Sequence, residues 1–122
     1  MTLKILLIDD DVAVLRTLEF VLGDRGYDVV TARDGAEGLR LFQSNPPDLV
    51  ITDLIMPEKE GIETIIEMRQ ARPNAKIIAI SGGGRTHNTC FLKMAASLGA
   101  VAVLPKPFMP DELAAKIEEA MQ

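Results

Sequence analysis

The stretch DLVITDLIMPEKEG, residues 48–61, decides how this chain can fold. Residues 49–51, Leu-Val-Ile, form an apolar run that predicts a short buried strand, and Thr52 can extend it. Asp53 follows directly, although a buried carboxylate is costly unless a partner or a metal ion compensates its charge. An aspartate at the end of such a strand therefore needs a functional explanation.

Strands and helices are expected to alternate on either side of this stretch. Besides the strand at 48–52, apolar runs predict strands at 3–8, 28–31, 76–80 and 100–104. Helical periodicity predicts helices over about 12–26, 35–44, 60–72, 91–98 and from 110 to the end. The strand runs are mostly Val, Ile and Leu, which indicates burial on both faces. The sequence therefore predicts an α/β fold, with a parallel sheet covered by helices.

The apolar spacing also predicts which face of each helix is buried. The residues expected to face inward are Leu15, Leu18 and Leu22, then Ala36, Leu39 and Phe42, then Ile62, Ile65 and Ile66, then Phe91, Met94, Ala95 and Leu98, and finally Leu113, Ile117 and Met121. Asp11 is expected to cap the first helix, and Gly99 to end the fourth.

Length and composition limit the class of protein. The chain has 122 residues, so we expect a single domain over 1–122 with no output domain in this chain. The start at Met1 favours a native N-terminus, whereas the end at Gln122 leaves open whether the chain stands alone or is a fragment. A net charge of −5 argues against direct nucleic-acid binding. A single cysteine suits the cytoplasm, and no apolar run has transmembrane or signal-peptide character.

Polar residues stand at the carboxyl ends of four predicted strands. Asp9 and Asp10 follow the first strand, Asp53 the third, Ser81 the fourth and Lys106 the fifth. In an open parallel sheet these ends lie at one edge, where ligands bind. Crowded carboxylates repel one another, and Mg²⁺ relieves that repulsion while leaving room for a phosphoryl oxygen. The sequence therefore predicts a phosphoryl-transfer site, in which an aspartate can serve as the nucleophile.

The motifs at these strand ends carry a family resemblance. They read ILLIDDD, DLVITDLIMPEKEG, AISGGG and LPKPF, and together they resemble the receiver domain of two-component response regulators over essentially the whole chain. The resemblance implies a flavodoxin-like (βα)5 doubly wound sheet with strand order 2-1-3-4-5. It also implies that Asp53 is the phosphoacceptor, with Ser81 and Lys106 contacting the phosphoryl group. Lys106-Pro107 is similar to the family's cis peptide.

The resemblance further implies a metal ion and protein partners. Mg²⁺ would be bound by Asp9, Asp10, Asp53 and the backbone carbonyl of Ile55. A histidine kinase or phosphotransfer protein would donate the phosphoryl group, docking near the first helix and the loop after the fifth strand. An unidentified downstream protein would read a surface made by the fourth helix, fifth strand and fifth helix, and phosphorylation would favour a dimer. Such a chain is a cytoplasmic signalling domain rather than an enzyme, and contacts neither nucleic acid nor membrane.

Two departures from the family pattern affect the expected signalling. Val103 stands where the family often has an aromatic residue that turns inward, so an aromatic flip cannot be the readout. Ile55 and Gly83 occupy positions that influence how water reaches the acyl phosphate, and their opposing effects leave its lifetime open.

Three other functions remain as alternatives. Val103 motivates a constitutive interaction module that works without phosphorylation. A phosphatase acting on small phosphoesters is disfavoured, because residues 9–11 are contiguous aspartates rather than a DxD motif. Flavin binding is ranked last, because the chain has only Tyr27 and four phenylalanines to form an aromatic wall and lacks a phosphate loop. The glycines at 82–84 do not form a P-loop, because no Lys-Ser/Thr pair follows them.

Overall fold

The computed structural model describes residues 2–54, 61–81, 97, 99–105 and 108–121. In these residues the strands are β1 (Lys4–Ile8), β2 (Asp28–Ala32), β3 (Leu49–Asp53), β4 (Ile77–Ser81) and β5 (Ala102–Pro105). The helices are α1 (Val12–Asp24), α2 (Gly35–Ser44), α3 (Gly61–Ala71) and α5 (Pro110–Ala120). The fourth helix expected over 91–98 lies almost entirely outside the described residues.

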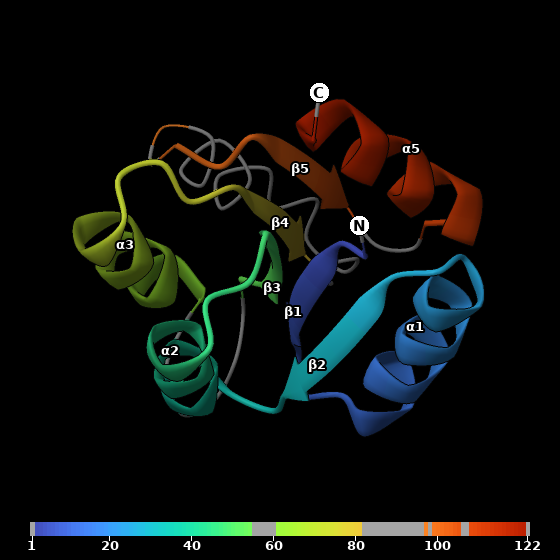
Figure 1. The fold of residues 1–122 in the computed structure, drawn as a ribbon, viewed down its shortest axis with the longest axis horizontal. Coiled ribbons are helices and arrows are strands. Elements are labelled where there is room, and N and C mark those ends of the chain that lie inside the picture. Colours follow the sequence, from blue (N-terminus) through green and yellow to red (C-terminus); the bar gives the residue numbers. More distant parts are fainter. Residues whose placement is uncertain (1, 55–60, 82–96, 98, 106–107, 122) are drawn as a thin grey trace.

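The strands form one sheet in the order β2-β1-β3-β4-β5, and every pair in it is parallel. Figure 1 shows α1 and α5 on one face of the sheet and α2 and α3 on the other. This arrangement confirms the predicted flavodoxin-like α/β fold and its strand order. All strands therefore end at the same edge, which brings the residues that follow them together.

The core has two layers, one on each face of the sheet. One layer packs the sheet against α1 and α5, including Leu15, Leu22 and Ile117. The other packs it against α2 and α3, including Phe42 and Met68. The central strand β3 is buried along its whole length, whereas the edge strands β2 and β5 are buried only in part. Pro105 ends the edge strand β5, where a residue without a backbone N–H is tolerated.

The inward faces of α1 and α5 follow the prediction, but two helices differ. In α3, Ile66 is 37% exposed, whereas Ile65 and Met68 are fully buried. Consecutive residues point about 100° apart around a helix, and Thr64 and Ile65 occupy the buried face of α3, which turns Ile66 toward the solvent. In α2, Ala36 is exposed and Gly38 is buried in its place.

The ends of α1 are set by local chemistry. Asp11 is the N-cap, and its Oδ1 accepts hydrogen bonds from the backbone N–H groups of Ala13 and Val14 at 3.0 and 3.4 Å. This confirms the capping role expected from the sequence. The helix ends at Asp24, and Gly26 follows with a φ of +96°, a conformation that favours glycine.

Candidate functional site

Asp53 is the last residue of β3, the central strand of the sheet. Its backbone pairs in register with Ile80 of β4, and the N–H of Leu54 donates to the Ile80 carbonyl at 2.9 Å. The pairing with β4 thus continues one residue beyond the strand end. Asp53 is only 5% exposed, so the residue is nearly buried, and the pairing with β4 holds its backbone in place.

Asp9 and Asp10 follow β1, the strand next to β3. Asp9 is fully buried, and its backbone N–H donates to the carbonyl of Ala32 at 3.1 Å. Its Oδ1 accepts a hydrogen bond from the N–H of Asp11 at 2.9 Å, which orients the carboxylate. Asp10 is exposed. Of these three neighbouring acids, Asp11 caps α1 with its side chain, while Asp9 and Asp10 lie at the edge of the sheet.

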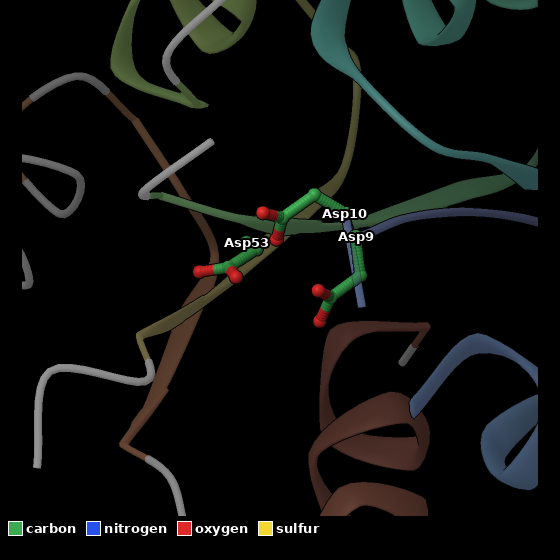
Figure 2. Close-up of side chains that lie close together, drawn as sticks. All are labelled: Asp9, Asp10 and Asp53. Carbon is green, nitrogen blue, oxygen red and sulfur yellow. The ribbon is translucent and has the colours of Figure 1, made fainter. Parts of the chain in front are cut away.

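Asp9, Asp10 and Asp53 meet at this edge. Each offers a carboxylate oxygen, and these oxygens all lie within 4.8 Å of one another (Figure 2). In an octahedral Mg²⁺ site with metal–oxygen bonds of about 2.0–2.1 Å, neighbouring ligand oxygens lie about 2.9 Å apart and opposite ones about 4.2 Å apart. The three carboxylates fit a magnesium ion in ligand type, and the limit of 4.8 Å on their separation is close to the spacing of opposite ligands in such a site. They would supply part of its coordination and leave positions for other oxygens.

The other predicted site residues are placed only in part. Ser81 is the last residue of β4, and its backbone pairs in register with Pro105 of β5. Its backbone therefore lies at the same edge as Asp53. Lys106, Ile55 and the Lys106-Pro107 peptide fall outside the described residues. Their expected roles in phosphoryl and metal binding remain predictions.

Val103 occupies the expected position in β5. It is partly buried and packs against the core layer on the α2 and α3 side. Its backbone pairs with Ala79 of β4, two residues before Ser81. The aliphatic side chain of Val103 thus takes the position where the resembled family often has an aromatic ring.

Gly38 is a residue that the sequence analysis did not assign. It lies in α2, and a Cβ atom there would overlap Cδ1 of Ile8 and lie 2.9 Å from its Cγ1. The backbone of α2 therefore approaches the end of β1 at the residue just before Asp9. A glycine inside a helical pattern was the available signal, because it costs about 1 kcal/mol relative to alanine unless packing requires it.

The sequence and the fold of this chain are similar to those of known proteins. Residues 5–118 match the response regulator receiver domain. The chain belongs to this family. It is 31% identical over 122 residues to the alkaline phosphatase synthesis transcriptional regulatory protein PhoP of Bacillus subtilis, spanning all of this chain and 50% of that protein. It is 36% identical over 118 residues to the transcriptional regulatory protein GlrR of Escherichia coli, spanning 97% of this chain and 26% of that protein.

Solved structures of receiver domains also resemble this chain. A response regulator receiver domain protein from Clostridium thermocellum matches with a TM-score of 0.87 at 35% identity, covering 98% of this chain and 94% of that one. A CheY-like receiver domain protein from Methanospirillum hungatei matches with a TM-score of 0.89 at 31% identity, covering 99% and 94%.

These similarities identify the class of protein and show how much of each relative this chain covers. The chain is a response regulator receiver domain of two-component signal transduction. It spans about half or less of the length of the two relatives named above. None of the helices in the described residues has the length and apolar character needed to cross a membrane.

Proposed function

We propose that this receiver domain accepts a phosphoryl group on Asp53 from a histidine kinase or phosphotransfer protein in a Mg²⁺-dependent reaction. The observation that carries the proposal is the convergence of three carboxylates, from two neighbouring strands, within 4.8 Å at one edge of the sheet. Asp9 and Asp53 are both buried there, and carboxylates grouped in this way are suited to bind a cation. A metal ion and a phosphoryl-binding lysine would place positive charge beside them.

The backbone around Asp53 suits it to act as a nucleophile. Pairing between β3 and β4 holds the carboxylate in place before the donor arrives, which lowers the entropic cost of reaction. A carboxylate oxygen of Asp53 attacks the phosphorus of the donor's phosphohistidine. The new O–P bond replaces the P–N bond, whose electron pair stays on the imidazole nitrogen, and that nitrogen then takes up a proton. Attack by water on the phosphorus would later release phosphate and restore the carboxylate.

We assign the remaining roles by the same reasoning. Asp9, Asp10, Asp53 and the carbonyl of Ile55 would hold the magnesium ion. When bound, Mg²⁺ neutralises negative charge on the phosphoryl oxygens. Lys106 would add a positive charge and Ser81 a hydroxyl donor to those oxygens.

The proposed output is a change in a protein-binding surface. The phosphoryl group would draw the Ser81 hydroxyl and shift the balance between two states of the surface that includes β5 and α5. A downstream protein would bind one state preferentially, and phosphorylation would favour a dimer. We place this single-domain activity in the cytoplasm, without direct nucleic-acid contact by the chain itself.

The proposal is tested by incubating the protein with Mg²⁺ and acetyl phosphate. Intact-mass measurement should show one labile adduct on the native chain. Asp53→Asn should abolish the adduct, and so should omission of Mg²⁺. Asp24→Asn is the matched control, because it makes the same change at an exposed aspartate at the end of α1, and it should leave the adduct unchanged. A folded, Mg²⁺-binding protein that forms no adduct would refute the proposal.

The alternative is a constitutive interaction module, and Val103 favours it. The partly buried valine already packs against the core, so no aromatic ring is available to report phosphorylation. This function requires the same partner affinity with and without the adduct. The fully phosphorylated and Asp53→Asn proteins would then bind the downstream partner equally.

A further inference from the structure

A groove lies at the edge of the sheet opposite to the carboxylate cluster. The groove has a volume of about 480 Å³, and it is bordered by the start of β3 and by the connection from α3 to β4. Phe42 and Met121 give it apolar walls, while Arg72 and Lys76 bring two positive charges. Val50 is the groove residue furthest along β3, and Asp53 follows it by three residues, or roughly 10 Å of strand, at the other end of β3.

The two cations in the groove are available to a ligand. The guanidinium carbon of Arg72 lies 5.8 Å from the centroid of the Phe42 ring, a cation–π distance. Arg72 is exposed, and no carboxylate among the described residues forms an ion pair with Arg72 or Lys76. The guanidinium is thus positioned over the ring while its N–H groups remain free for a carboxylate.

The groove also contains one acid, Asp48, which is engaged by the fold. Its Oδ2 accepts a hydrogen bond from the backbone N–H of Lys4 at 2.8 Å, tying it to the start of β1. The groove therefore combines an apolar floor with two cations and one anion, on a chain whose net charge is −5. Such a local positive site on an acidic protein is complementary to an anionic ligand.

We propose that this groove binds an acidic, partly apolar segment of another protein. Arg72, Pro73 and Asn74 are all exposed, so the site is an open groove rather than a cavity enclosing a small molecule. A carboxylate of the segment would pair with Arg72 through two parallel hydrogen bonds, and a second would meet Lys76. An apolar side chain between them would pack against Met121, which is partly exposed, because Phe42 is only 2% exposed and already lies beneath Arg72. Asn74 has both a donor and an acceptor for the segment's backbone.

Binding at this groove is independent of phosphorylation at the carboxylate cluster. The groove shares no residue with the proposed phosphorylation site and lies at the other end of β3. Asp53→Asn should therefore leave the binding unchanged. A negative result for peptide binding at the groove can therefore be told apart from a negative result for phosphorylation of Asp53.

The test uses backbone amide NMR of the whole chain titrated with a short synthetic peptide that alternates Glu and Leu. We expect saturable shifts confined to the amides around Phe42, Asp48 and residues 71–76. The double variant Arg72→Gln with Lys76→Gln should weaken binding about tenfold or more, because charge-assisted hydrogen bonds are lost. Asp48→Asn should strengthen it, because a repelling charge is removed while the amide oxygen can still accept from Lys4.

Matched controls make each outcome decisive. Arg16→Gln with Arg40→Gln changes the net charge equally at exposed arginines outside the groove, and it should leave binding unchanged. The same peptide with Gln in place of Glu should not bind. The proposal is overturned if the shifts do not saturate, if the control variant weakens binding as much, or if acetate alone reproduces the shifts.

Discussion

Replacing Gly38 with alanine should destabilise the protein, although alanine favours helices. The added Cβ would overlap Cδ1 of Ile8 and lie 2.9 Å from its Cγ1. Ile8 is fully buried, so its side chain has no free volume in which to turn away. The helix would have to move off the sheet, or Ile8 would have to leave its preferred rotamer.

The expected change in the free energy of unfolding for Gly38→Ala is the sum of two opposing contributions. Removing a glycine from a helix interior gains about 1 kcal/mol. Forcing an extra methyl group into a packed core costs about 1–3 kcal/mol. With a direct overlap, we expect a steric cost in the upper part of that range, about 2–3 kcal/mol, and therefore a net loss of about 1–2 kcal/mol in the free energy of unfolding. For a domain of this size, that lowers Tm by about 3–8 °C.

Urea denaturation followed by circular dichroism measures this loss, and two comparisons isolate its cause. Gly23→Ala is the matched control, because Gly23 lies in α1 and a Cβ there meets nothing within 4 Å. That substitution should stabilise the protein by about 0.5–1 kcal/mol. Ile8→Val removes Cδ1, so combining it with Gly38→Ala should recover about 1 kcal/mol of coupling energy in a double-mutant cycle.

If Gly38→Ala is as stabilising as Gly23→Ala, the added Cβ does not clash with Ile8. If Ile8→Val and Gly38→Ala destabilise additively, the two side chains do not interact. Either result would mean that α2 can adjust freely over the end of β1, and that Gly38 is not required for the close approach.

Two further predictions concern the metal site and the core. Mg²⁺ should raise Tm because it binds the carboxylate cluster of the folded protein, and at a hundred times its Kd the stabilisation is about 2.7 kcal/mol. Asp53→Asn should reduce that stabilisation. Equal stabilisation of both proteins in calorimetry would contradict the proposed metal site. Ile65→Ala should cost about 2–5 kcal/mol and Ile66→Ala well under half as much, since Ile65 is fully buried and Ile66 is 37% exposed; equal losses in urea denaturation would contradict the assigned face of α3.

Much of the fold could be predicted from local patterns. The continuous apolar runs at β1, β3 and β4 identify strands because those strands are covered on both faces. Asp11 could be assigned as a cap because an aspartate oxygen reaches the first backbone N–H groups of a helix regardless of the rest of the fold. The strand order came from the family resemblance, because periodicity alone does not say which strands are neighbours.

Other features could not be predicted, because they depend on contacts between distant segments. The face of α3 was misjudged at Ile66, since adjacent isoleucines leave the local pattern ambiguous and packing against the sheet decides between them. Gly38 acquires its role only when α2 crosses the end of β1. The groove likewise depends on the contact between Phe42 of α2 and Arg72, which follows α3 and is 30 residues further along the chain.

The alternation of strands and helices and the position of acids at the strand ends are encoded locally, because both follow from periodicity and residue chemistry. By contrast, the approach of the Asp9, Asp10 and Asp53 carboxylate oxygens to within 4.8 Å of one another arises from long-range contacts. That distance depends on β1 and β3 being neighbours in register, with Leu6 opposite Val50 and Ile8 opposite Thr52. Such pairing is settled by the long-range packing of the whole sheet and its helices.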